Sequence, residues 1–200
     1  MDITRNMNGA RALVVGAGLA LALAMGTAPT PAMAAGRVGS TKVMVRTEID
    51  NVNFKVPTVI PFVAKADGTL QGPSEDATTI DNLSAYGIHV TNMKIDAMNT
   101  WTIAADAKTG SAQNSIDFKV GPDGALQDAS AATQGTGIDL SKNATFDMGY
   151  QGIAGGSDKI KLKTSGNVAR VTRDIFHITG EGDQVATITW TVEPGEHATA

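Results

Sequence analysis

The near-identical tetrapeptides around the two tryptophans constrain the fold most strongly. Thr-Trp-Thr-Ile occupies residues 100–103, and Thr-Trp-Thr-Val occupies residues 189–192. Successive side chains of a β-strand point to opposite faces, so each tryptophan shares a face with the aliphatic residue two positions later. Each tetrapeptide therefore predicts a strand with one apolar face. Two interpretations stay open: Trp101 and Trp190 pack in a core, or one of them also presents an edge to a ligand.

Strand signals continue along the chain, and no segment sustains helical periodicity beyond two turns. Predicted strands or extended segments cover residues 43–49, 52–64, 86–95, 99–105, 115–120, 158–164 and 185–193. Pro57 and Pro61 place the second of these at a sheet edge or at a crossing between sheets. The apolar phase of the third shifts between Val90 and Met93, which predicts a β-bulge. With Gly-, Asn-, Asp- and Ser-rich connections, this pattern predicts an all-β fold, an antiparallel β-sandwich with long polar loops.

A short internal repeat predicts two hairpins. Residues 60–71 and 116–127 share Ile, Phe two positions later, Asp-Gly five positions after the Phe, and then Leu-Gln. Glycine accepts a positive φ at low cost, so each copy predicts a strand, a tight turn and a second strand. A calcium loop at Asp67 or Asp123 is the alternative. Such a loop needs several carboxylates at alternate positions, and each site offers one.

Two stretches are rich in small and polar residues and predict long surface loops. They cover residues 127–141 and 151–157, where large apolar side chains are few. Loops at the ends of a sandwich often carry binding specificity. Solvated connections without a binding role are the simpler alternative, because nothing in either stretch indicates a ligand.

The N-terminus predicts secretion. A basic start, an uncharged apolar run over residues 12–27 and Ala-Met-Ala at residues 32–34 have the layout of a secretory signal peptide. A membrane-spanning helix is the alternative, but the run is shorter than the ~20 residues that a span needs. We expect residues 1–34 to be a cleaved signal peptide. Residues 35–200 then form a single domain, with a short polar tail over residues 194–200.

Composition and missing motifs exclude several functions. The chain has no cysteine, which rules out disulfides and thiol catalysis, and its net charge of −4 argues against a nucleic-acid partner and, after signal cleavage, against a membrane partner. His89 and His177 lie in predicted strands, where a hydrogen-bonded or outward-facing histidine is typical, and His197 lies in the tail. The sequence contains neither a metal-binding His motif nor a Gly-x-Ser-x-Gly motif, so we expect no catalytic residue, no metal and no cofactor. Carboxylates brought together only by the fold are the one open route to catalysis.

Two segments of the chain carry a family resemblance. Residues 186–192 read Ala-Thr-Ile-Thr-Trp-Thr-Val, and residues 90–103 lead from Val-Thr-Asn to Asn-Thr-Trp-Thr-Ile. These segments resemble the closing segment and the first motif of the WxL domain of Gram-positive surface proteins, with Ile103 and Val192 where the family has leucine. The resemblance implies non-covalent attachment to the cell wall. Peptidoglycan is the implied ligand, and the implied binding residues are Trp101, Ile103, Trp190 and Val192.

We therefore predict a non-catalytic protein that is secreted, extracellular or associated with the cell wall. Its predicted partner is a cell-wall glycan or peptidoglycan, with other surface proteins as further candidates. The alternative function is an adhesin or fibre subunit that assembles by strand addition, with residues 52–63 as the predicted edge. A secreted hydrolase is the third candidate function. We expect Trp190 to serve mainly as core and Trp101 as the contact residue, because a terminal strand must be held by its own packing.

Overall fold

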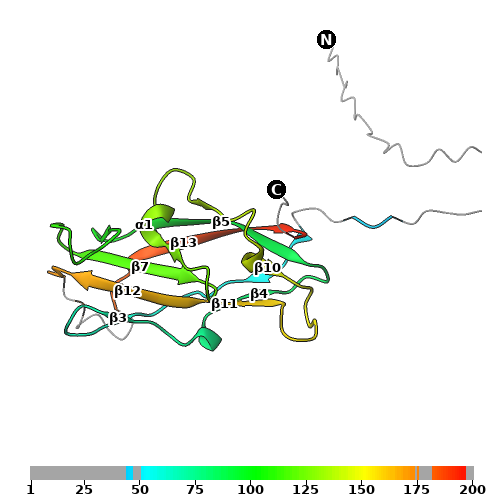
Figure 1. The fold of residues 1–200 in the computed structure, drawn as a ribbon, viewed down its shortest axis with the longest axis horizontal. Coiled ribbons are helices and arrows are strands. Elements are labelled where there is room, and N and C mark those ends of the chain that lie inside the picture. Colours follow the sequence, from blue (N-terminus) through cyan, green and yellow to red (C-terminus); the bar gives the residue numbers. More distant parts are fainter. Residues whose placement is uncertain (1–43, 47–50, 174, 176–181, 197–200) are drawn as a thin grey trace, which may run out of the picture. The chain divides into compact units, whose positions relative to one another are not determined.

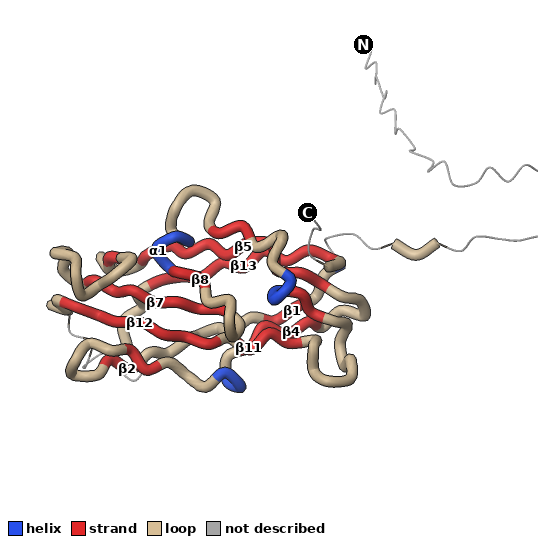
Figure 2. Tube along the Cα trace, in the orientation of Figure 1, coloured by secondary structure: helices blue, strands red, loops and turns tan. Residues whose placement is uncertain are grey.

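β-Strands make up most of the regular structure, and the helices are short (Figures 1 and 2). The computed structural model describes residues 44–46, 51–173, 175 and 182–196. The chain divides into two units, and every element below belongs to the second, Val45–Ala200. No helix among the described residues is long and apolar enough to cross a membrane.

Several predictions from the sequence concern residues that the structure does not describe. The signal peptide over residues 1–34 and the histidines His177 and His197 lie outside the described residues. Of the strand predicted over residues 43–49, only residues 44–46 are described, and they are not in a strand.

The strands of the described residues form three sheets and one hairpin. The first sheet has the order β1 (Phe54–Lys55), β4 (Thr79–Asn82) and β11 (Lys159–Lys161). The second has the order β10 (Asp147–Met148), β5 (Ile88–Ala97) and β13 (Ala186–Pro194), and β9 (Ile138–Asp139) also pairs with β5. The third has the order β12 (Lys163–Ala169), β7 (Ser115–Gly121) and β6 (Thr102–Ile103), and β8 (Gln127–Asp128) also pairs with β7. Strands β2 (Val63–Ala64) and β3 (Leu70–Gln71) form the hairpin.

Antiparallel pairing dominates, which confirms the predicted all-β class. The one parallel pair among these strands is β6 with β7. The helices that lie wholly within the described residues are α1 (Ala129–Ala132) and two single turns of 3₁₀ helix, η2 (Glu75–Ala77) and η3 (Ala144–Phe146).

The two longest strands, β5 and β13, pair along their whole length and contain the predicted bulge. Thr191 pairs with Asn92 and Val192 pairs with Val90, so Thr91 is the extra residue on β5. This extra residue explains why the apolar phase of β5 shifts, because one added residue turns every later side chain to the opposite face.

The predicted strand over residues 158–164 is two strands, β11 and β12, which belong to different sheets. The chain passes from the first sheet to the third at Leu162, whose backbone N–H donates to the carbonyl oxygen of Thr78 at 2.8 Å. The predicted alternation holds across this crossing: Ile160 and Leu162 are buried, while Lys159 and Lys161 are exposed.

Both copies of the internal repeat are hairpins, as predicted. Strands β2 and β3 pair antiparallel, and so do β7 and β8. Gly68 and Gly124 adopt φ values of +83° and +76° in the two turns, the left-handed conformation that glycine accepts most easily. Strands β2 and β8 are short, however, with two residues each.

The prediction of a long surface loop over residues 127–141 is wrong, because this stretch is structured and partly buried. It contains β8, α1 and β9, and Ala129, Ala132 and Leu140 are buried in the core. Asp128 caps α1 by accepting a hydrogen bond from the backbone N–H of Ser130. Alanine is small enough for a helix to approach a sheet closely, so the absence of large apolar residues did not indicate exposure. The stretch 151–157 contains no helix or strand, as predicted.

The core joins side chains from all three sheets. Its largest fully buried members are Phe146, Ile80, Ile88, Met93 and Ile95, and residues of β7, β11 and β13 pack in the same cluster. Two predicted strands are much shorter than expected. The segment 52–64 contains only β1 and β2, because its two prolines lack the N–H that a sheet ladder needs. The segment 99–105 contains only β6.

Candidate binding groove

A cavity of about 950 Å³, which we call the groove, lies between β13 on one side and β7 with residues 57–64 on the other. Aromatic and branched aliphatic side chains supply much of its lining, among them Phe62, Ile116, Phe118, Val120, Ile188 and Trp190. The rings of Phe62 and Phe118 lie 5.8 Å apart in a tilted arrangement. A concave and mostly apolar site with a few polar groups is typical of a binding site.

Residues 57–64 form one wall of the groove and keep apolar side chains accessible. Val59 is 70% exposed and Val63 is 64% exposed, although both line the groove. Pro57 and Pro61 carry no backbone N–H, so this segment cannot form a continuous ladder with a neighbouring strand. Its position at an edge agrees with the prediction, since β1 and β2 each pair with a single strand.

Strand β13 forms the opposite wall. Ile188 and Trp190 are half-buried and line the groove, while Thr189 between them is exposed and does not line it. Among the described strands β13 pairs with β5 alone, so within the described residues it is the last strand of its sheet. The backbone groups on its other side therefore have no described strand partner.

The groove brings together two of the four predicted binding residues. Trp101 and Trp190 both line it, although they are far apart in the sequence. Ile103 and Val192 do not line it: Ile103 packs against the core, and Val192 is buried in the core with 6% exposure.

The roles expected for the two tryptophans are reversed in terms of burial. Trp101 is only 6% exposed and its indole Nε1 donates to Oδ2 of Asp183 at 2.8 Å, whereas Trp190 is half-buried and open to the groove. The expectation that the terminal strand holds the core tryptophan was wrong. On β13 the buried core residue is Val192, while Trp190 lies at the groove.

Asp183 gathers three donors at one end of the groove. Besides the indole of Trp101, Nδ2 of Asn99 donates to its Oδ1 at 3.1 Å and Nε of Arg173 donates to its Oδ2. Burial opposes ionisation of the Asp183 carboxyl, but the hydrogen bonds from Arg173 and Trp101 outweigh it and lower its pKa. The ionised carboxylate thus fixes the indole of Trp101 against the groove wall. Sequence reasoning missed Asp183, because no local pattern links it to a tryptophan 82 positions away.

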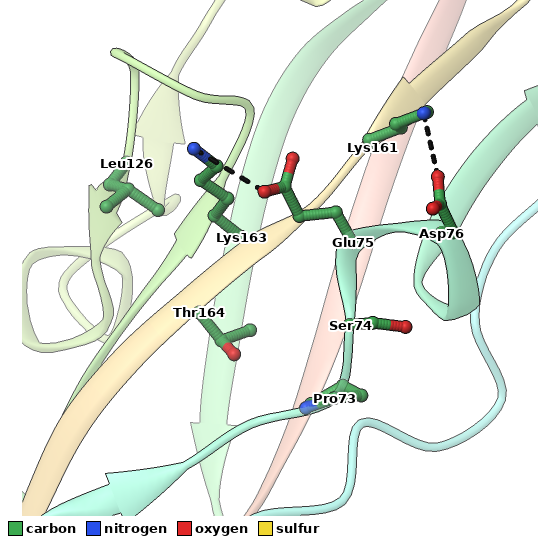
Figure 3. Close-up of a pocket in the computed structure, with 8 residues that line it drawn as sticks. All are labelled: Pro73, Ser74, Glu75, Asp76, Leu126, Lys161, Lys163 and Thr164. Atoms are coloured by element: carbon green, nitrogen blue, oxygen red, sulfur yellow. Dashed lines mark ion pairs between the residues drawn. The ribbon is translucent and has the colours of Figure 1, made fainter.

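A second cavity of about 640 Å³ is charged rather than apolar (Figure 3). Nζ of Lys161 lies 2.7 Å from Oδ1 of Asp76, and Nζ of Lys163 lies 3.4 Å from Glu75 and 2.8 Å from Asp123. The hydrogen bond between Lys161 and Asp76 lowers the pKa of the aspartate and raises that of the lysine. Because these exposed charges neutralise one another, this cavity offers little net charge to a ligand.

His89 has the hydrogen-bonded role that the sequence predicted. It is 2% exposed; its Nδ1 faces Oδ1 of Asp147 at 2.5 Å and its Nε2 faces the carbonyl oxygen of Leu140 at 2.9 Å. The predicted calcium alternative gains no support: Asp67 accepts from the backbone N–H of Thr69, and Asp123 pairs with a lysine.

The groove has the chemistry of a binding site for an apolar, extended ligand. Its lining combines aromatic and aliphatic side chains with polar groups, one wall belongs to a strand that has a described strand partner on one side alone, and its acidic group is already held by three donors. Within the described ranges, no group of three or more His, Cys, Asp or Glu side chains could hold a metal ion. Comparison of the chain with protein-family models, with curated proteins and with solved structures found no match.

Proposed function

We propose that this chain is a secreted, non-catalytic surface protein whose groove binds an extended polypeptide segment by strand addition to β13. The observation that carries this proposal is the open edge of β13 beside an apolar groove. An added strand satisfies the free backbone groups of the edge, and its alternate side chains enter the groove.

The composition of β13 supports an edge that accepts a strand. Natural sheet edges are usually protected by lysine, proline or an inward-pointing charge. The seven residues from Ala186 to Val192 contain none of these, and every second one is threonine. The nearest protective features are Glu193 and Pro194 at the end of the strand, and the bulge residue lies on β5 instead.

Amide hydrogen exchange tests strand addition without knowledge of the occupant. Exchange over residues 186–192 should slow as the protein concentration or the concentration of a bound segment rises. Strand β7 is the matched control, because it pairs on both sides and its exchange should not depend on concentration. If β13 exchanges at the same rate under all conditions in which complexes form, strand addition at this edge is wrong.

The fold and the location are parts of the same proposal. We propose that the β5–β13 sheet and the β7–β12 sheet are the two layers of a β-sandwich, which the shared core of β5, β7 and β13 side chains supports. Secretion rests on the signal-peptide layout of residues 1–34.

Wall association is a second candidate function, which the position of Trp190 favours. A half-buried indole at an apolar groove can contact a sugar face, and Gln184 and Thr187 at the groove supply hydrogen-bonding groups. The resemblance to the WxL domain supplies the ligand class, a cell-wall glycan or peptidoglycan.

Trp190→Phe should keep the thermal midpoint and weaken capture of the protein by purified cell walls. Leu126→Phe, at the charged cavity, is the control and should leave capture unchanged. Equal capture of the wild type and a folded Trp190→Phe variant would remove Trp190 from the wall-binding function.

A further inference from the structure

We infer that the occupant of the groove is residues 41–49 of a second copy of this chain, added as a strand beside β13. This inference rests on the proposed strand addition and names its partner. Three features of the chain point to this segment: its side-chain pattern, its length, and the exposure of its described residues.

The pattern of residues 41–49, Thr-Lys-Val-Met-Val-Arg-Thr-Glu-Ile, fits the groove. In a strand, Val43, Val45 and Ile49 share one face with two threonines, while the other face carries one methionine and the charged residues, among them Arg46 and Glu48. One face therefore suits the apolar groove wall, and the charged face suits solvent. The segment is rich in β-branched residues, which favour an extended backbone.

The length of the segment also matches the length of β13. Residues 41–49 number nine, as do the residues of β13 from Ala186 to Pro194. Nine extended residues span about 30 Å. Asn51 follows the segment by two positions, and its carbonyl oxygen accepts a hydrogen bond from the Tyr86 hydroxyl at 2.7 Å.

The exposure of the described part of the segment points to a second copy. Met44 is 89% exposed and Val45 is 95% exposed, so the groove of the same chain does not hold Val45. An exposed valine side chain favours burial against another apolar surface, and Val45 lies on the face of the segment that would enter the groove. A segment of one copy in the groove of the next is a head-to-tail contact, which leaves a free segment at one end and a free groove at the other. Copies therefore add in series.

The first experiment compares two acidic variants of the donor segment in the chain as it is processed on secretion. Val45→Asp places a charge on the face that enters the groove, and Met44→Asp places the same charge on the opposite face. Light scattering after size exclusion should show concentration-dependent oligomers for the wild type and for Met44→Asp, and a single-chain mass for Val45→Asp. Both changes lie at exposed positions, so neither should alter the thermal midpoint.

The second experiment blocks the groove and then restores assembly by mixing. Val59→Asp/Val63→Asp charges two exposed positions of the groove wall and should also give a single-chain mass, while Leu126→Asp, outside the groove, should assemble normally. A mixture of the Val45→Asp chain and the groove variant should form 1:1 dimers and nothing larger. The Val45→Asp chain has the only intact groove in this mixture, and the groove variant has the only intact segment, so a pair cannot grow further.

The outcomes separate this inference from the function on which it rests. If Val45→Asp still assembles while the groove variant does not, another segment fills the groove: the inference is overturned and strand addition stands. If the folded groove variant assembles like the wild type, the groove is not the acceptor and both are overturned. A wild-type chain that has a single-chain mass at all concentrations overturns the second copy as occupant.

Discussion

Replacement of Asp183 is the sharpest test of how the groove is held together. The side chain of Asp183 is 5% exposed and accepts hydrogen bonds from Trp101, Asn99 and Arg173. Asp183→Ala leaves the buried indole N–H of Trp101 without its acceptor, at a cost of about 1–3 kcal/mol. Removal of one partner of a fully buried ion pair costs about 3–5 kcal/mol, but Arg173 is one-third exposed and can regain water. We therefore expect a loss of about 2–4 kcal/mol.

The assay is urea unfolding at neutral pH, with Asp183→Asn as the matched variant. Asparagine keeps an acceptor for the Trp101 indole but loses the charge that faces Arg173, so its cost should be about half that of alanine. A double-mutant cycle with Trp101→Phe should give a coupling energy of about 0.5–3 kcal/mol, because the two side chains are in direct contact. A loss under about 0.5 kcal/mol for Asp183→Ala, or additive single changes, would refute the view that this carboxylate anchors the groove.

The same contacts make the contribution of Asp183 depend on pH. Its pKa in the folded chain is lowered from an ordinary value near 3.9. A lowered pKa means that the folded state binds the proton less tightly than the unfolded state. The stabilisation is therefore complete above the unfolded pKa and is lost as the pH falls through the folded pKa. The difference in stability between wild type and Asp183→Asn should stay constant from pH 5 to 8 and shrink below about pH 4.

Three further predictions concern the body and its processing. Gly166→Ala should lower the free energy of unfolding by about 1–3 kcal/mol, because the added Cβ would overlap the β7 backbone at Asp117 and Phe118. Gly110→Ala, with ordinary contacts, should change it by under about 0.5 kcal/mol. Urea unfolding should show a loss of about 1–3 kcal/mol for His89→Ala, because two hydrogen bonds of a buried side chain disappear; an unchanged midpoint would contradict that role. N-terminal sequencing of the secreted chain should begin at Ala35, and an intact apolar run would contradict cleavage.

The parts of the fold that were predictable are those in which side-chain alternation is unbroken. Strand β13 and the bulge of β5 follow from the residues themselves, because period-two burial leaves a direct trace in the sequence. Strand β4 (Thr79–Asn82) leaves almost none, since its only apolar side chain is that of Ile80. Its position is fixed by pairing with β1 and with β11, about 80 residues later in the chain. Such long-range pairing has no local signal.

The groove was predictable only in part. The tryptophan tetrapeptides identified two residues that line it, but burial of Trp101 depends on Asp183, which is distant in sequence. The edge position of β13 is a property of the sheet order, not of the strand sequence. An interior strand and an edge strand can share the same alternation, so the sequence indicated an apolar face without indicating that one side of the ladder is open.

In the proposed assembly, the open edge of β13 and the exposed side chain of Val45 account for each other. A strand edge without charge or proline carries a risk of indiscriminate pairing, and sequences ordinarily protect against it. Here Ala186 to Val192 lacks that protection, and the apolar residues Met44 and Val45 stand exposed in the same chain. If the edge served no pairing, a single lysine among its exposed threonines would protect it without loss of core packing. Thr189→Lys tests pairing at this edge directly. The side chain is exposed but stands opposite Lys94 of β5, so the change should cost under about 1 kcal/mol of stability, and it should lower the mass of the oligomers. Oligomers of unchanged mass in the folded variant would contradict pairing at this edge.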